Sequence, residues 1–131
     1  MKNQQSGFTL IELIAVIVIL GILAATAVPR FINLSDAAEE AALDAIAGSM
    51  GSAMALNYAA AVAESAGLDV SSTPPIAITD CDEVGSILQD GMPSGYTVAS
   101  QALATLGATA NCVVTQTSSG ETETFTGLGA P

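Results

Sequence analysis

The chain has 131 residues, and its 13 acidic side chains stand against only two basic ones and no histidine, which gives a formal net charge of -11. Binding of nucleic acid is not expected, because a protein needs clustered lysines and arginines to replace the counterions on phosphates. The length suits one domain, but part of it is too apolar for a soluble core. The globular part must therefore be small.

The first predicted element is an apolar helix from Phe8 to Val28. At about 1.5 Å per residue, its length matches the roughly 30 Å hydrocarbon core of a bilayer. Glu12 is its one charge. The polar residues 1–7 carry Lys2, which predicts that this end stays cytoplasmic and that the domain after Arg30 crosses the membrane. Arg30 is a mild exception to that rule.

A second helix is predicted from Ser35, as its cap, to Ala66, with Gly67 as its stop. Together with the apolar segment it makes one long helix. Pro29 should bend or loosen this helix because proline lacks a backbone donor, and Gly21 is a second weak point. The predicted apolar stripe consists of Leu43, Ile46, Met50, Met54, Tyr58 and Val62, and the negative charge of the expected first turn comes from Asp36, Glu39 and Glu40.

The rest of the chain predicts a small antiparallel sheet. Residues 68–75 form a loop by their serines and paired prolines, and a short helix capped by Thr79 and Asp82 is expected to run through Gln89. A Ser-Ser-Gly turn at 118–120 separates the last two strands. The sheet should pack on the second half of the long helix, which gives an α+β fold. The expected strands are Tyr96 to Ser100, Cys112 to Thr117 and Glu121 to Thr126.

The sequence contains two cysteines, Cys81 and Cys112, without a histidine or a CxxC that would suggest a metal site. A disulfide is the simpler interpretation, and closing a loop of roughly 30 residues would stabilise the fold by about 3 to 4 kcal/mol. Such a bond persists in an oxidising compartment. The alternative is a pair of buried free thiols in a cytosolic protein.

No metal site, cofactor or enzymatic activity is expected. Asp80, Asp82, Glu83 and Asp90 lack the glycine-centred loop that wraps a calcium ion. The Asn33-Leu34-Ser35 glycosylation pattern is short enough to arise by chance. Without histidine, a GxSxG elbow or a lysine partner, the serines and threonines have no activating base.

The residues Gly7-Phe8-Thr9-Leu10-Ile11-Glu12 resemble the class III signal of type IV pilins and of secretion pseudopilins. The match includes the glycine before the cut, the phenylalanine after it and the glutamate as fifth residue from Phe8. Gly21 and Pro29 also fall where the family has its helix-loosening residues. Within the type IVa pilins, residues 29–34 are similar to mannose-sensitive haemagglutinin (MSHA) pilins.

This resemblance implies three parts: a prepilin leader at 1–7, a transmembrane and polymerisation helix at 8–28, and a globular periplasmic or extracellular pilin domain at 29–131. It further implies that a prepilin peptidase cleaves between Gly7 and Phe8 and methylates the new amino group of Phe8. In the family, the glutamate corresponding to Glu12 faces the amino terminus of a neighbouring subunit. An acid within a membrane segment is costly, which favours such a partner; alternatively, Glu12 only favours the positive end of its own helix.

The expected function is structural: the major pilin of a type IV pilus, serving surface attachment, with a role in motility open. The precursor would be a single-pass protein of the inner membrane with its C-terminal domain in the periplasm, and assembly machinery would build it into an extracellular homopolymer. The alternative is a pseudopilin of a type II secretion system. A third hypothesis is a monomeric, membrane-anchored periplasmic binding domain.

Overall fold

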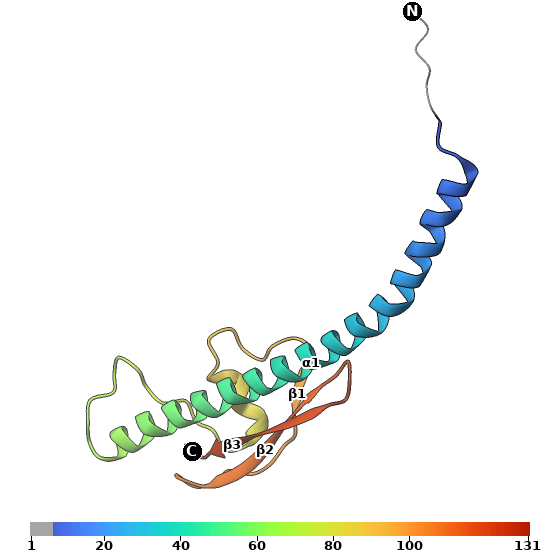
Figure 1. Cartoon of the computed structure of the whole chain (residues 1–131). Coiled ribbons are helices and arrows are strands. Elements are labelled where there is room, and N and C mark those ends of the chain that lie inside the picture. The colour runs from blue at the N-terminus through green and yellow to red at the C-terminus, as the bar shows by residue number, and fades with distance from the viewer. Residues whose placement is uncertain (1–6) are drawn as a thin grey trace, which may run out of the picture. The chain divides into compact units, whose positions relative to one another are not determined.

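The computed structural model describes residues 7–131, except for the side chains at 31–33. The predicted leader up to residue 6, with Lys2, lies outside the described residues, as do the side chains of Asn33 and its two predecessors. In chain order the elements are helix α1 (Leu10–Ser65), 3-10 helix η1 (Cys81–Ser86), and strands β1 (Tyr96–Val98), β2 (Thr109–Gln116) and β3 (Thr122–Leu128) (Figure 1). This is the predicted α+β fold. The chain divides into two compact units, of which the first ends at Glu39 and the second is Glu40–Pro131.

The first unit contains the N-terminal part of α1. The helix begins at Leu10, two residues after the predicted start, and continues through Gly21, Pro29 and Ser35. The prediction that Ser35 caps a second helix is therefore wrong, since the residues on both sides of it are helical. Asp36 and Glu39 consequently lie inside a helix, too far from its N-terminus to benefit from the helix dipole.

The second unit begins with the rest of α1, which ends at Ser65, one residue before the predicted end, with Gly67 as the predicted stop. Gly67 has a φ of +79°, and its amide donates to the carbonyl of Glu64, while the amide of Leu68 donates to the carbonyl of Ala63. This is the Schellman arrangement, which needs a residue that adopts left-handed backbone angles without strain. Glycine at position 67 meets that need.

One face of this helical part supplies the core of the second unit. Leu43, Met50 and Met54 from the predicted stripe are buried, and Ala47 joins them. Ile46 and Tyr58 are half-buried, and Val62, also predicted for this stripe, is exposed. The core partners from the remaining elements are Ile78, Cys81, Val84, Leu103, Cys112, Val114 and Phe125.

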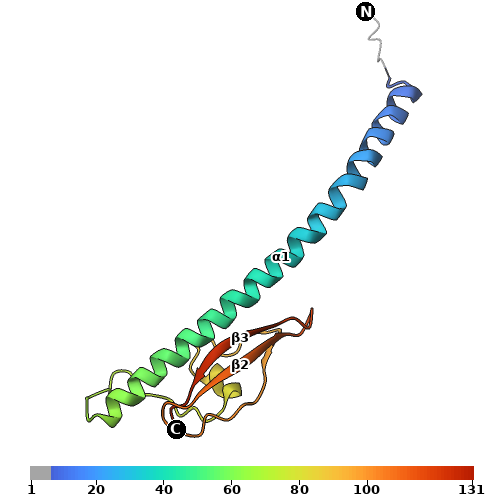
Figure 2. The ribbon, with the colours of Figure 1, turned by 60° about the horizontal axis from the view of Figure 1, so that its bottom comes forward.

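The sheet has the order β1-β2-β3 with antiparallel neighbours and lies beside the second half of α1 (Figures 1 and 2). In β2, Cys112, Val114 and Gln116 alternate with less buried residues, which is the pattern of a strand with one face on the core. The predicted hairpin is present, and its last register pair is Thr115 with Thr122. Away from the turn its strands extend beyond the prediction because Thr109, Ala110 and Leu128 continue the pairing. The predicted strand residues Thr117 and Glu121 lie outside the strands, and β1 ends at Val98 rather than Ser100.

The short helix differs from its prediction in both extent and cap. It is the 3-10 helix η1, ending at Ser86 rather than Gln89, and its N-cap is Asp80. The Asp80 side chain accepts from the backbone of Asp82, and the Glu83 carboxylate accepts from the Asp80 amide at 3.1 Å, which forms a capping box. Thr79 and Asp82, the predicted caps, flank the residue that performs this role.

Candidate functional site

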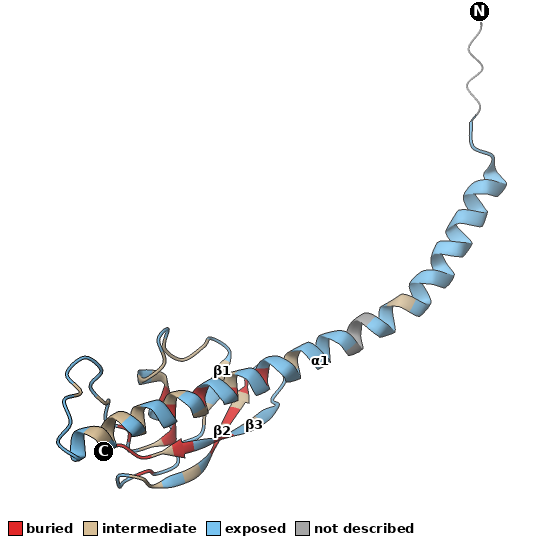
Figure 3. Cartoon of the chain, turned by 60° about the vertical axis from the view of Figure 1, so that its left-hand side comes forward, coloured by how far each residue is buried: buried red, intermediate tan, exposed pale blue. Residues whose placement is uncertain are grey.

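The first unit presents apolar side chains that no other part of the described chain covers. Among the described residues, α1 is the one helix with an 18-residue stretch apolar enough to cross a membrane, with mean hydropathy 2.7 and none of the stretch buried. Figure 3 shows this part of α1 almost entirely as exposed. Exposed apolar surface of this extent is unfavourable in water and requires lipid or protein around it.

Glu12 and Thr9 are joined by reciprocal hydrogen bonds at the start of α1. The Thr9 amide and hydroxyl both donate to Oε2 of Glu12, at 2.8 and 2.7 Å, and the Glu12 amide donates back to the Thr9 hydroxyl at 3.4 Å. This is a capping box, in which Thr9 is the cap and Glu12 the third helical residue. Glu12 therefore satisfies backbone donors of its own helix.

Thr9 was not predicted to cap the helix, although the sequence around it carries the pattern of a cap. Thr9-Leu10-Ile11-Glu12 has the T-x-x-E spacing of a capping box directly before an apolar run. Both Thr9 bonds end on Oε2, so Oε1 takes no part in the cap. The capped carboxylate thus keeps one oxygen for another partner. Capping its own helix and contacting a neighbouring subunit are therefore compatible roles for Glu12.

The other residues singled out in this region lie where the backbone leaves them accessible. Gly7 and Phe8 precede α1 in non-helical backbone, and the Phe8 side chain is 86% exposed. Gly21 lies within α1, and a methyl group added there would contact nothing within 4 Å. Pro29 is also inside α1. Roles for Gly21 and Pro29 in assembly stay predictions.

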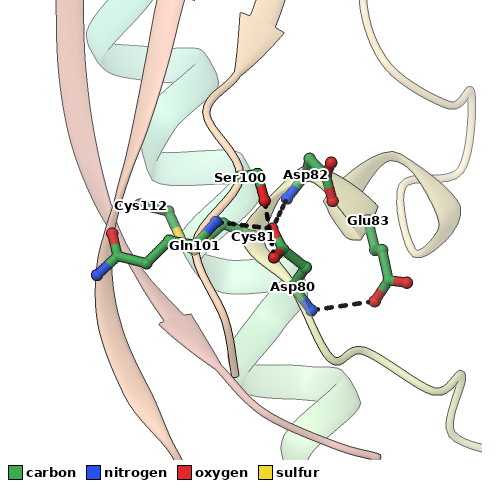
Figure 4. The surroundings of a disulfide bond; sticks show 7 residues. All are labelled: Asp80, Cys81, Asp82, Glu83, Ser100, Gln101 and Cys112. Atoms are coloured by element: carbon green, nitrogen blue, oxygen red, sulfur yellow. Dashed lines mark hydrogen bonds between the residues drawn. A yellow bond between two sulfur atoms is a disulfide. The ribbon is translucent and has the colours of Figure 1, made fainter. Parts of the chain in front are cut away.

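The two cysteines lie in the second unit and form the expected disulfide. Cys81 in η1 and Cys112 in β2 are bonded, with their Cα atoms 5.7 Å apart and both side chains fully buried (Figure 4). Gly127 lies against this bond, since a methyl group added to it would overlap Sγ of Cys112 and approach Sγ of Cys81 to 3.3 Å. The disulfide thus ties η1 to the sheet within a tightly packed core.

Asp80 holds a network of hydrogen bonds next to the disulfide. Its carboxylate accepts from the Gln101 amide at 2.7 Å and from the Ser100 hydroxyl at 2.9 Å, in addition to the Asp82 amide (Figure 4). Partial desolvation raises the pKa of Asp80, but these hydrogen bonds together outweigh it and hold the pKa below its ordinary value. The carboxylate thereby joins the loop before Leu103 to η1.

The neighbouring carboxylates respond in opposite directions. Desolvation, followed by the charge of Asp80, raises the pKa of Asp82, whereas the Thr79 amide, followed by other hydrogen bonds, lowers the pKa of Glu83. Within residues 7–131, no group of three or more histidine, cysteine or acidic side chains could hold a metal ion. Of the acidic residues weighed as a calcium site, Asp80 and Glu83 accept hydrogen bonds from backbone amides.

A family model and several relatives match this chain. The model describes the prokaryotic N-terminal methylation motif and matches residues 2–28. The type IV narrow pilus major component of Thermus thermophilus is 44% identical over 94 residues, which cover 72% of this chain and 69% of that protein. The chain belongs to the type IV pilin family. In this pilin-family chain, the apolar half of α1 is the family's N-terminal segment.

Two further relatives match over shorter stretches of the chain. The type II secretion system core protein G of Pseudomonas aeruginosa is 58% identical over 38 residues, 29% of this chain and 27% of that protein. A type IV major fimbrial protein of Dichelobacter nodosus is 61% identical over 33 residues, 25% of this chain and 21% of that protein. No solved structure gave a significant match. The relatives support a role as a pilin or pseudopilin, and the motif and the apolar helix fit a membrane-anchored precursor.

Proposed function

We propose that the chain is the major subunit of a type IV pilus that serves surface attachment. The observation that carries this proposal is the exposed apolar surface of α1 in the first unit, whereas the apolar side chains of the second unit form a core of their own. Lipid would cover that surface before assembly, and copies of the same helix would cover it in the fibre. A head-to-tail contact that does not close repeats into a helical filament.

Processing would convert the precursor into the polymerising form. A prepilin peptidase would cleave between Gly7 and Phe8 and methylate the new amino group. The described part of this site supports cleavage, because Gly7 and Phe8 are exposed and lie before the first helical residue. A peptide bond outside regular structure can enter a peptidase without unfolding a helix.

Glu12 would pair with the amino group of Phe8 in an adjacent subunit. Both hydrogen bonds from Thr9 end on Oε2, so Oε1 is not used in the cap. A cation from a neighbouring subunit can therefore bind Oε1 while the start of the helix stays capped. In a water-poor fibre core such a pair would be strong, and an unpaired carboxylate would be costly. The role proposed for the chain is structural, without enzymatic activity.

The location and subtype follow as parts of the same proposal. The precursor would span the inner membrane once with its C-terminal domain in the periplasm, where the disulfide persists, and the assembled fibre would be extracellular. Similarity of residues 29–34 to MSHA pilins supports a type IVa pilus of that kind.

A pseudopilin of a type II secretion system is the second candidate, favoured by the relative from Pseudomonas aeruginosa. Both functions use the same helix, so cellular location separates them. A major pilin should be recovered in surface fibres sheared from cells, whereas a pseudopilin should stay in the cell envelope.

The decisive experiment combines electron microscopy of sheared fibres with mass spectrometry of the subunit's N-terminus. We expect fibres whose subunit begins with methylated Phe8.

Glu12→Leu should lower fibre yield by roughly tenfold or more, because the neighbour's amino group loses its partner. Glu12→Asp is the matched control, since it keeps the charge and should retain more assembly. An uncut Met1 start without fibres would contradict the proposal and favour a monomeric anchored domain. Normal assembly of Glu12→Leu would contradict the pairing proposed for Glu12.

A further inference from the structure

Arg30 is an isolated positive charge in an acidic chain. The sequence has two basic residues, Lys2 and Arg30, against 13 acidic ones. Cleavage after Gly7, as proposed above, would remove Lys2. Arg30 would then be the one basic side chain of the mature subunit, and it is exposed on α1.

No carboxylate of the first unit is spaced to pair with Arg30 along its own helix. Side chains three and four residues apart meet on a helix surface. At those distances from Arg30 the sequence has Thr26, Ala27, Asn33 and Leu34. Asp36 follows six residues later, which is about 9 Å along the axis and between one and two turns on, and so on another face. A partner for Arg30 must come from elsewhere.

The sequence has no lysine or arginine after Arg30 to pair with the acidic residues that follow it. Carboxylates recur along α1 at Asp36, Glu40 and Asp44, and like charges four residues apart on a helix repel one another. The dipole of a helix start does not offset this repulsion, because α1 begins far upstream at Leu10. A positive side chain from outside would relieve it.

The proposed assembly contact sets the distance between equivalent residues of neighbouring subunits, and the inference rests on that contact. If the amino group of Phe8 in one copy lies level with Glu12 of the next, the copies are offset by about 6 to 8 Å, because the non-helical step from Phe8 can be longer than a helical one. Identical subunits in a helical fibre share one axial step, so the same offset applies at every residue, whatever path the chain takes between.

That offset brings opposite charges to similar heights. Arg30 of one subunit lies level with residues 34 to 35 of its neighbour, within about 3 Å of the level of Asp36. An extended arginine side chain spans such a difference. Glu39 is about 6 to 7.5 Å away in the same direction, which makes it the poorer partner.

We propose that Arg30 of each subunit forms an ion pair with Asp36 of the adjacent subunit and thereby helps to set the register of the fibre. Both residues are exposed in α1, as such a contact requires. The pair would lie outside the apolar segment and would be screened by salt, unlike a Glu12 contact in a water-poor core. Added salt should therefore lower the stability of the fibre by weakening the ion pair that Arg30 forms.

Charge reversal tests the pair. Arg30→Asp and Asp36→Arg should each reduce sheared fibres by roughly tenfold, because each places like charges together, and the double variant should restore most of the yield. Arg30→Asp with Glu39→Arg is the matched control and should stay defective. Wild-type yield from either single variant, or no recovery in the double variant, would overturn the proposal. Absence of wild-type fibres would instead refute the proposed function.

Cross-linking provides a test without charge repulsion. In fibres of the Arg30→Cys/Asp36→Cys variant, mild oxidation should link adjacent subunits into a ladder of covalent multimers on non-reducing gels. The native Cys81–Cys112 bond is fully buried and should not contribute. Each single variant should stop at dimers, and Arg30→Cys/Asp44→Cys should give a much weaker ladder. Equal ladders from the variants with cysteine at position 36 and at position 44 would refute the proposed register between subunits. The absence of a ladder in intact fibres would refute it as well.

Discussion

The two units of this pilin-family chain use apolar side chains from the same helix in opposite ways. In the first unit, Ile17 is 59% exposed, and its apolar neighbours are similarly uncovered. In the second unit, Met50 and Met54 are fully buried against η1 and the sheet. Figure 3 displays the contrast as exposed residues in one part of α1 and buried ones in the other.

The difference separates folding from assembly. Side chains with partners inside the chain stabilise the fold, whereas side chains without such partners are available to lipid or to other copies. A substitution in the first unit should therefore alter assembly with little effect on unfolding, and a substitution in the second unit should do the reverse.

The largest expected effect comes from truncating a buried side chain. Met50→Ala should lower the free energy of unfolding by about 2 to 5 kcal/mol, because it leaves a cavity in the core. Ile17→Ala should change it by less than about 0.5 kcal/mol. Urea denaturation of the full chain in detergent measures both. Equal losses would show that the two units do not differ in this way.

A smaller change in stability is expected when a tightly packed glycine or an open glycine is replaced by alanine. Gly127→Ala should cost about 1 to 3 kcal/mol, since the new methyl group overlaps the disulfide. Gly48→Ala is the matched control: a methyl group there meets nothing within 4 Å and should stabilise the helix by about 0.5 to 1 kcal/mol. Thermal unfolding of both variants checks the signs. A neutral Gly127→Ala would mean that the core around the disulfide can relax.

The smallest effect concerns pH. The pKa of Asp80 is lowered in the fold, so its ionised form adds stability that is present above its ordinary pKa of about 3.9 and lost as pH falls through the folded value. Asp80→Asn should therefore be less stable than wild type near neutral pH, with the difference shrinking in acid. Denaturation curves measured from pH 7 down to acid pH test this.

Asp82→Asn serves as the control of opposite sign. Because the pKa of Asp82 is raised, its ionised form opposes folding at neutral pH, and the variant should be the more stable one there. That gain should vanish as wild-type Asp82 becomes protonated on acidification. The same sign for both variants would contradict the network drawn around Asp80.

Several features could be predicted because neighbouring residues carry the information. The apolar span, the stop at Gly67 and the alternation of the β2–β3 hairpin all depend on spacing within a short stretch. Thr9 belongs to this class as well, since the T-x-x-E pattern was visible. The cap at Ser35 was wrong because local preference favours a helix start there, although a helix entering from upstream leaves no start to cap.

The sequence by itself determined that this chain has an apolar helix with an acid near its start, a helix stop and a strand pair, because hydropathy, spacing and turn residues are local properties. Only the tertiary structure decided that Asp80 binds Ser100 and Gln101, and that Gly127 lies against the disulfide. Those outcomes depend on residues distant in the chain, whose proximity follows from the path of the backbone rather than from local preference.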